Sequence, residues 1–543
     1  MLKYFLLLLI PILGVSPVSA QSAGYGNHDD LTSRLRQLPV TYPGFAKLTS
    51  LTKTVGQKDI WLLTVGSGDY SAKPAIVIAG GIEGTHLLGT ELSLSFAELL
   101  LGASGTSEVD ELLSGHTFYI LPDMSPDARE QYFSVFKYER KGNANSDYKD
   151  RYGSPVDHPF LDLNGDGMIS MMRISDPSGE WIEHPDDSRV MIRAEKAEGQ
   201  QGRYSLYPEG VDMARTERWS EAGVEFNKNF SFSYPVFTRG SGIHALSENE
   251  TRAVAEFLFG AKNVYAVFSF GPANNLTEPI KFNESKASGR IISGILQEDA
   301  HINAMVSKRY REITGDTSGN FSEGTGGDFF QWAYFHYGRH SFSTPGWRVP
   351  AESENSKSEK GSGGNSNTEL MFLRWAEKEN IDNVFIPWEK VNHPLFPDLE
   401  VEVGGTDPFA MINPPDNMIG PLAEMHYDFL LDLAGMRPSI DILNIKTDDL
   451  GKGLFRVTAD VSNTGILPTV SELGERTRWV QKTVVRIETG KDQQILSGRS
   501  VEVLPAIEGG SKETRSWLIR GRGEVKLRAG AENTGFREIS VKL

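Results

Sequence analysis

Apolar and polar positions along the chain predict strands followed by helices. Residues 73–81 form an apolar, β-branched run, and residues 90–100 after it have helical spacing. Two further apolar runs, 117–122 and 263–270, are typical of buried strands, and the sequence 247–250 predicts a capping box at the start of a helix. Strands that alternate with helices predict an α/β domain with a mostly parallel, mixed sheet between two helical layers, an α/β/α sandwich.

The pattern changes after residue 438. Residues 454–461 alternate between apolar and polar positions, and Asn-Thr-Gly turns follow at 463–465 and 533–535. Several short strands with such turns over about a hundred residues are typical of an immunoglobulin-like β-sandwich. We therefore predict an α/β domain over residues 25–436 and a β-sandwich over residues 438–543.

Two stretches interrupt the predicted α/β domain. Residues 138–220 are polar and show no periodicity of their own, which favours a functional loop or an insertion. Residues 351–368 are of low complexity, and we expect them to form a mobile loop.

The N-terminus is typical of a secretory signal peptide over residues 1–20. Lys3 precedes an apolar core, and Val18-Ser19-Ala20 offers a small-x-small cleavage signal. No later stretch approaches the ~20 apolar residues that a spanning helix needs. These features predict a secreted or periplasmic protein without a membrane span.

Composition narrows the chemistry further. The chain has no Cys, so it has no thiol for a lipid anchor, a disulfide or a thiolate metal site. Any metal must use His, carboxylate or carbonyl ligands. The formal net charge of −17 disfavours a nucleic-acid partner, because phosphates would repel the protein.

Four motifs in order resemble the zinc carboxypeptidase (carboxypeptidase A-like) family, in particular its long secreted bacterial members. They are the Gly-Gly-Ile turn at 80–82, Gly-Val-Glu-Phe-Asn-Lys-Asn-Phe at 223–230, the strand end Phe-Ser-Phe-Gly at 268–271, and an aromatic helix at 328–334 followed by Ser-Phe-Ser-Thr-Pro-Gly-Trp at 341–347. The resemblance covers roughly residues 42–434 and implies the family's α/β fold.

The resemblance also implies a catalytic zinc held by His, Glu and His, with a Glu as general base. Here Glu83 stands where the family has its first His, and His86 stands where it has its Glu. The third ligand position is Gly271, or Phe268 in a shifted register, and the general-base position is Pro345.

The substrate-binding positions of the family are partly retained. Asn227 matches the family's Asn, whereas Lys228 replaces the Arg that would bind a substrate carboxylate with two parallel hydrogen bonds. We expect a pocket around Lys228 that is mildly basic and accepts an anionic group.

Two interpretations of Glu83 and His86 remain open at this point. Both residue types can bind a divalent cation, and His336 or His340 could supply a third ligand for a rearranged zinc site. The favoured alternative is that Glu83 and His86 only form hydrogen bonds with each other or with solvent, so that zinc is absent.

Residues 162–170 match the first nine positions of a calcium loop. The candidate calcium positions are Asp162, Asn164, Asp166, Met168 and Ser170. Position twelve is Arg173, where an acid is expected, although Asp176 or Glu180 could contribute through a different path. The alternative is a surface loop of Asx turns without a cation.

Together these observations predict an exported carboxypeptidase-like protein that binds a peptide or a cell-wall-type glycan without catalysis. One alternative is an active zinc metallocarboxypeptidase that uses a rearranged Glu83 and His86 site. Another is a cell-surface scaffold that binds through the β-sandwich.

Overall fold

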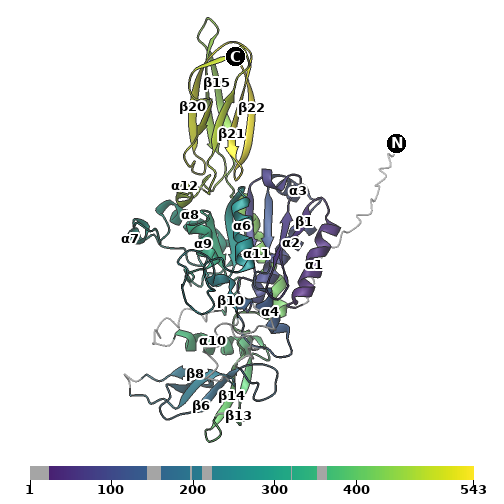
Figure 1. Ribbon diagram of the computed structural model, residues 1–543, viewed down its shortest axis with the longest axis vertical. Coiled ribbons are helices and arrows are strands. Elements are labelled where there is room, and N and C mark those ends of the chain that lie inside the picture. Colours follow the sequence, from purple (N-terminus) through teal and green to yellow (C-terminus); the bar gives the residue numbers. More distant parts are fainter. Residues whose placement is uncertain are drawn as a thin grey trace, which may run out of the picture.

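The computed structural model describes residues 24–143, 160–195, 199–210, 223–319, 321–350, 364–394, 396–477 and 479–543. Three parts follow one another along the long axis of the molecule, with a β-sandwich at one end, an α/β layer in the middle and a small antiparallel sheet at the other end (Figure 1). The predicted signal peptide, 1–20, lies outside the described residues, as does most of the predicted mobile loop, 351–368. The last residues of that loop belong to helix α10 (Gly364–Glu379).

The central sheet contains six strands in the described chain, in the order β1–β2–β4–β3–β11–β12. They are β1 (Ala46–Lys53), β2 (Asp59–Val65), β3 (Ala75–Ala79), β4 (Thr117–Leu121), β11 (Val264–Phe270) and β12 (His340–Thr344). Strands β4, β3, β11 and β12 are parallel, whereas β1 and β2 pair antiparallel. The predicted mixed, mostly parallel sheet is confirmed.

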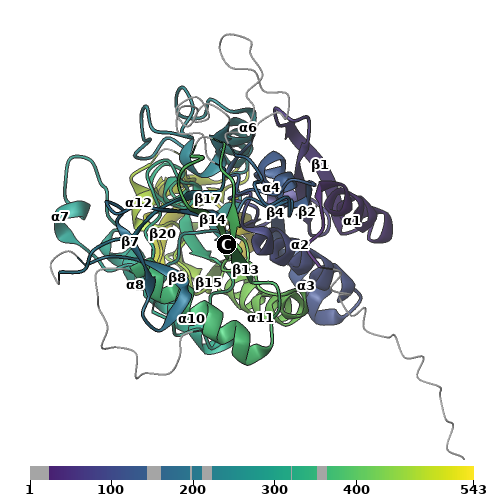
Figure 2. The ribbon, with the colours of Figure 1, turned by 90° about the horizontal axis from the view of Figure 1, so that it is seen from below.

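Helices cover both faces of this sheet. One face packs against α1 (His28–Thr41), α2 (Leu87–Gly102), α8 (Gln297–Thr314) and α11 (Asp416–Gly435), and the other packs against α6 (Asn249–Gly260) and α9 (Phe329–Phe335). Because successive strand residues point to opposite faces, Ile76 and Ile78 of β3 join the first core and Val77 joins the second. Viewed from below, α1 and α2 lie on one side of the molecule and α8 lies on the opposite side (Figure 2).

Shorter elements complete the α/β layer. They are η1 (Tyr70–Ala72), α3 (Ser107–Gly115), α4 (Pro126–Phe133), β5 (Gly142–Asn143), β10 (Val224–Glu225), η3 (Phe226–Lys228) and α7 (Glu284–Ala287). Among the described residues no single helix is long and apolar enough to cross a membrane; α2 and α3 reach that length and apolarity only together, and the pair bends by 117°.

The predicted capping box at the start of α6 is wrong. The helix begins one residue later than expected, with Glu248 as its N-cap and no side-chain cap. Ser247 Oγ donates a hydrogen bond to the carboxylate of Glu248. Glu250 points inward, where its Oε1 accepts a hydrogen bond from Asn143, so it cannot reach back to the cap.

Within the predicted functional loop or insertion, residues 171–193 and 204–208 form four strands, which their polar sequence did not indicate. The second sheet has the order β13–β14–β6–β9–β7–β8 and is antiparallel. Its strands are β6 (Met171–Ser175), β7 (Trp181–His184), β8 (Asp187–Arg193), β9 (Tyr204–Pro208), β13 (Phe385–Val391) and β14 (Val401–Thr406). The sheet has its own small core around Met172 and Val403. The strands pair across more than two hundred residues of sequence, which a local pattern does not reveal.

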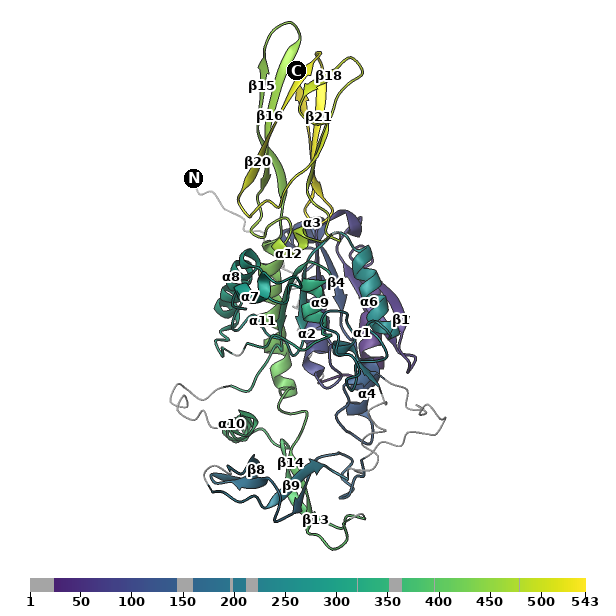
Figure 3. The same cartoon turned by 60° about the vertical axis from the view of Figure 1, so that its left-hand side comes forward.

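The C-terminal residues form two four-stranded antiparallel sheets, which confirms the β-sandwich. Their strands are β15 (Ile440–Asp449), β16 (Leu454–Asn463), β17 (Val484–Glu488), β18 (Gln494–Ser497), β19 (Val501–Val503), β20 (Lys512–Arg520), β21 (Glu524–Ala531) and β22 (Gly535–Lys542). Val457, Trp517 and Leu527 pack between the sheets. The short helix α12 (Glu472–Glu475) lies where the sandwich meets the α/β layer (Figure 3).

Candidate functional site

The turn between β3 and α2 places Glu83 and His86 at the carboxyl ends of the parallel strands. Two glycines make this turn possible. A Cβ on Gly80 would lie 2.2 Å from the carbonyl oxygen of Gly89, and Gly81 has a φ of +57°. A side chain at either position would clash or strain the backbone. The turn therefore brings both candidate residues to the edge where open α/β sheets form ligand sites.

Glu83 pairs with a lysine that the sequence motifs did not indicate. The Nζ of Lys141 lies 3.6 Å from Oε2 of Glu83. The carboxylate of Glu83, followed by those of Glu225 and Glu139, raises the pKa of Lys141. Lys141 is therefore an ammonium at neutral pH and offsets the negative charge of Glu83.

His86 makes a different contact from the one expected. Its Nε2 lies 2.9 Å from the carbonyl oxygen of Pro345, and because a carbonyl only accepts, Nε2 carries the proton and donates. Burial lowers the pKa of His86, so the ring is neutral. Its Nδ1 is buried and has no partner in the described chain, and a Cβ on Gly89 would lie 2.9 Å from it. The ring thus joins the turn after β3 to the end of β12.

The other expected zinc positions carry no ligand. Gly271 donates its backbone N–H to Thr344, and an added Cβ would lie 3.4 Å from Ile82, so a Cβ fits there without a clash. Phe268 is fully buried in the core, and Pro345 offers only its carbonyl. Among the described residues no group of three His, Asp or Glu side chains is placed to hold a metal ion. These residues do not fit the family's zinc site.

The two histidines considered as a third ligand lie in other hollows of the molecule. Nδ1 of His336 lies 2.8 Å from Oγ of Ser231, and Nδ1 of His340 lies 3.9 Å from Asp299. Within the described ranges neither joins Glu83 and His86 in a three-residue group. The rearranged site therefore finds no third ligand in His336 or His340.

Asn227 and Lys228 are both engaged within the protein. Asn227 is buried, and its Oδ1 accepts the backbone N–H of Phe329 at the start of α9. Nζ of Lys228 lies 2.8 Å from Oε1 of Glu225. An anionic ligand would have to compete with Glu225 for Lys228, so the expected basic character of this pocket is reduced.

A buried carboxyl lies close behind this charged cluster. Oε1 of Glu250 accepts a hydrogen bond of 2.8 Å from Asn143, and Oε2 is buried without a partner in the described chain. Burial raises the pKa of Glu250 to about 7. Glu250 therefore titrates near neutral pH, although no motif pointed to it.

In the candidate calcium loop, the carboxylates accept hydrogen bonds from the loop's own backbone. Asp162 accepts the N–H groups of Gly165 and Gly167, and Asp166 accepts that of Met168. The contact of Asp166 with Met168 is that of an Asx turn, whereas Asp162 reaches backbone groups three and five residues further along the loop. The described loop therefore holds its shape through its own side chains.

A buried glutamate from another strand faces both ends of this loop. Oε1 of Glu209 accepts the N–H of Leu163, and Oε2 accepts the N–H and the hydroxyl of Ser170. Burial raises the pKa of Glu209, and the charge of Asp166 raises it further. Glu209 follows β9, which pairs with β6, so only the sheet brings it to the loop.

The acids that the sequence offered as substitutes for position twelve are engaged elsewhere. Arg173 forms ion pairs with Glu402 and Glu183. Asp176 accepts hydrogen bonds from Ser178, and Glu180 pairs with Arg193.

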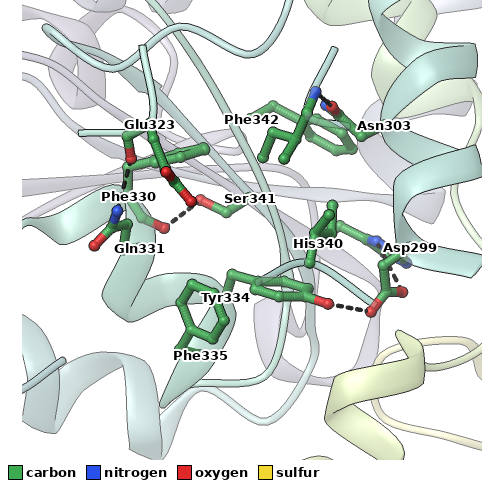
Figure 4. Close-up of a pocket in the computed structure, with 12 residues that line it drawn as sticks. Asp299, Asn303, Glu323, Phe330, Gln331, Tyr334, Phe335, His340, Ser341 and Phe342 are labelled. Atoms are coloured by element: carbon green, nitrogen blue, oxygen red, sulfur yellow. Dashed lines mark hydrogen bonds and ion pairs between the residues drawn. The ribbon is translucent and has the colours of Figure 1, made fainter. Parts of the chain in front are cut away.

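A further pocket lies beneath the β-sandwich, lined by apolar side chains and a cluster of polar ones (Figure 4). Asp299 of α8 accepts hydrogen bonds from the hydroxyl of Tyr334 and from the backbone N–H groups of Glu472 and Leu473 in α12. His340 lies on the same side of the pocket, and its Nε2 is buried without a partner in the described chain. The room inside is about 30 Å³, enough for a water molecule but not for a peptide side chain. Asp299 thus joins α8 to α12 at the edge of this pocket.

Comparison with known proteins gives two family matches. Residues 31–184 match the profile described as zinc carboxypeptidase, and residues 439–542 match one described as a domain of unknown function. The resemblance drawn from the motifs is thereby confirmed for residues 31–184, which include Glu83 and His86.

Individual relatives cover a limited part of the chain. Carboxypeptidase D of Mus musculus is 32% identical over 130 residues, which are 23% of this chain and 9% of that protein. Carboxypeptidase B of Astacus astacus is 26% identical over 163 residues, 30% of this chain and 46% of that protein. The matches thus span less than half of each relative. The crystal structure of thrombin activatable fibrinolysis inhibitor superposes with a TM-score of 0.42 and 14% identity, over 77% of this chain and 76% of that one.

Proposed function

We propose that this chain, whose residues 31–184 belong to the zinc carboxypeptidase family, is an exported protein that binds a peptide or glycan and does not cleave peptides through zinc. The observation that carries this proposal is the hydrogen bond from His86 to Pro345. In the family, the position of His86 supplies a metal ligand and the position of Pro345 supplies the general base. Here the two residues form a hydrogen bond with each other.

The charges around the turn support the proposal. Glu83 is compensated by Lys141, and Glu225 is compensated by Lys228. A general base must lie within hydrogen-bond reach of the water that it activates, and Pro345 has no group that accepts a proton. The site therefore lacks the groups for the family's chemistry, which supports binding without cleavage.

Metal content and peptidase activity of the mature protein test this proposal. We expect protein purified without chelators to carry well under one zinc per chain and to release no C-terminal residues from a mixed peptide library. The matched variant is the double substitution Glu83→Ala, His86→Ala, which should behave like the wild type in both assays. Chelator-sensitive release by the wild type that the double variant loses would establish the rearranged enzyme instead.

The predicted pocket around Asn227 and Lys228 is called the old substrate pocket. Its ligand is proposed to be a peptide or a cell-wall-type glycan that carries an acidic group. Lys228 is the cation proposed to bind it, after displacement from Glu225. Lys228→Ala should weaken the binding of an acidic peptide, whereas Lys262→Ala, a change on the exposed surface, should not. Equal affinities of the wild type and Lys228→Ala would place the ligand elsewhere.

A further inference from the structure

A groove lies at the opposite end of the central sheet from Glu83 and His86. Strand β12 runs from His340, near the β-sandwich, to Thr344, next to Pro345, so its two ends mark the two locations. The groove is lined by side chains of the α/β layer together with Thr477 and Trp479, which follow α12. It is open to solvent and has a volume of about 430 Å³, within the range of about 300–1,000 Å³ that small-molecule sites occupy.

Aromatic rings form one wall of this groove. The ring centroid of Phe259 lies 4.6 Å from that of Trp479 and 5.5 Å from that of Trp332. Trp479 is 56% exposed, and its indole N–H has no hydrogen-bond partner in the described chain. Its backbone carbonyl accepts a hydrogen bond from the buried Arg339, which fixes the residue at the rim. The rim thus presents a large apolar ring face and a free donor to solvent.

The polar groups of the groove are uncharged. Oγ of Ser231 lies 2.8 Å from Nδ1 of His336, and Nε2 of His336 has no partner in the part of the chain that the structure describes. Burial lowers the pKa of His336, so the ring is neutral at pH 7. Thr477 adds a hydroxyl, and none of the described residues that line the groove carries a formal charge at that pH. An ionic ligand would lose hydration here without gaining a counter-charge.

We propose that this groove binds a neutral oligosaccharide. A sugar ring has a face of C–H groups that packs against the rings of Trp479 and Phe259. Its rim of hydroxyl groups matches the uncharged donors and acceptors of Ser231, His336 and Thr477. This site is separate from the old substrate pocket and goes beyond the function proposed for that pocket.

Calorimetric titration of the full mature protein with cellohexaose, maltohexaose and chitohexaose tests the proposal. We expect at least one of these neutral sugars to bind, and Trp479→Ala to weaken that binding at least tenfold. Trp479→Phe keeps a ring and should lose less. Phe536→Ala is the matched control, because this ring is also exposed on the β-sandwich but lies outside the groove.

A second set of variants separates local unfolding from loss of the site. Ser231→Ala removes one hydroxyl and should weaken sugar binding several-fold while circular dichroism and the melting temperature stay unchanged. The double variant Glu83→Ala, His86→Ala should bind the sugar like the wild type. Sugar binding that this double variant loses would assign the ligand to the old substrate pocket and overturn the groove. Absence of any binding that depends on Trp479, or such binding of an uncharged aromatic peptide alone, would also overturn it.

Discussion

His86 donates a hydrogen bond of 2.9 Å from its Nε2 to the carbonyl oxygen of Pro345. The bond crosses from the turn after β3 to the end of β12, and the His86 ring is buried. The motif resemblance predicts that donor and acceptor stand at two catalytic positions of the carboxypeptidase family, and we propose that a contact that stabilises the fold has replaced a reactive one.

Removal of this imidazole should lower stability. His86→Ala leaves the carbonyl of Pro345 without its donor and opens a cavity against Gly89, so we expect a loss of about 1–3 kcal/mol in the free energy of unfolding. Urea denaturation measures this loss. The control is His301→Ala, an exposed ring on α8, which should change stability by less than about 0.5 kcal/mol.

The same experiment distinguishes a structural His86 from a metal ligand. A zinc-selective chelator should leave the denaturation curve of the wild type unchanged. A wild type that the chelator destabilises to the level of His86→Ala would contradict the structural role.

Glu250 should make stability depend on pH near neutrality. Its carboxyl has a pKa of about 7 in the folded protein and an ordinary value of 4.5, so the folded state binds the proton more tightly. Stability is therefore lost as pH rises from about 5 to 8, by up to about 3 kcal/mol. Glu250→Gln stays neutral and can still accept from Asn143, so its stability relative to the wild type should grow over that range.

Urea denaturation at pH 5 and pH 8 measures this difference between the two proteins. Glu256→Gln, an exposed acid on the same helix, is the control and should show no such dependence. Equal stability of wild type and Glu250→Gln at pH 8 would show that Glu250 is solvated.

Much of the α/β layer could be predicted because its strands are continuous apolar runs. Residues 117–122 and 263–270 contain β4 and β11, which are buried on both faces. Strands buried on both faces consist of near-continuous apolar residues and can be recognised in the sequence. Because the turn with Glu83 directly follows the predicted strand at 73–81, the sequence also predicted that Glu83 lies at the edge of the sheet. The local sequence pattern was sufficient to predict these strands, because the residues of such a strand are buried and therefore mostly apolar.

The partners in the candidate site could not be predicted from local sequence. Lys141 reaches Glu83 from the segment before β5, and Glu209 reaches the loop at Asp162 because β9 pairs with β6. The capping box failed for a related reason, since Asn143 on a distant strand attracts Glu250. Side-chain partners across a fold depend on the sheet order, which no short motif contains.

Calcium binding by the loop at 162–170 stays a prediction. Substitution of Glu209, which contacts the loop, offers a specific test of it. Glu209 accepts hydrogen bonds from Leu163 and Ser170 of the loop, and a cation would relieve the repulsion that Asp166 exerts on Glu209. We expect millimolar calcium, the range of extracellular modules at about 10⁻⁴–10⁻³ M, to raise the melting temperature of the wild type. Glu209→Gln should lose this shift, and Asp176→Asn, which caps a separate turn, should keep it. No shift in the wild type would leave the loop as a set of Asx turns.

Substitutions at positions 83, 86 and 271 should restore zinc binding first, and a further substitution at position 345 should then restore peptide cleavage. Glu83→His, His86→Glu and Gly271→His restore the three ligand types where the family places them, and a Cβ at position 271 meets Ile82 at an ordinary 3.4 Å. Lys141→Ala has to accompany them, because its ammonium would otherwise repel the metal. We expect this four-fold variant to bind zinc, measured by calorimetry, and the same variant without Gly271→His to bind it at least tenfold more weakly.

Adding Pro345→Glu supplies a base, so peptide cleavage should appear only in that variant, since turnover needs a proton acceptor within about 3 Å of the attacking water. Equal zinc affinity with and without Gly271→His would contradict the assignment of position 271 as the missing ligand.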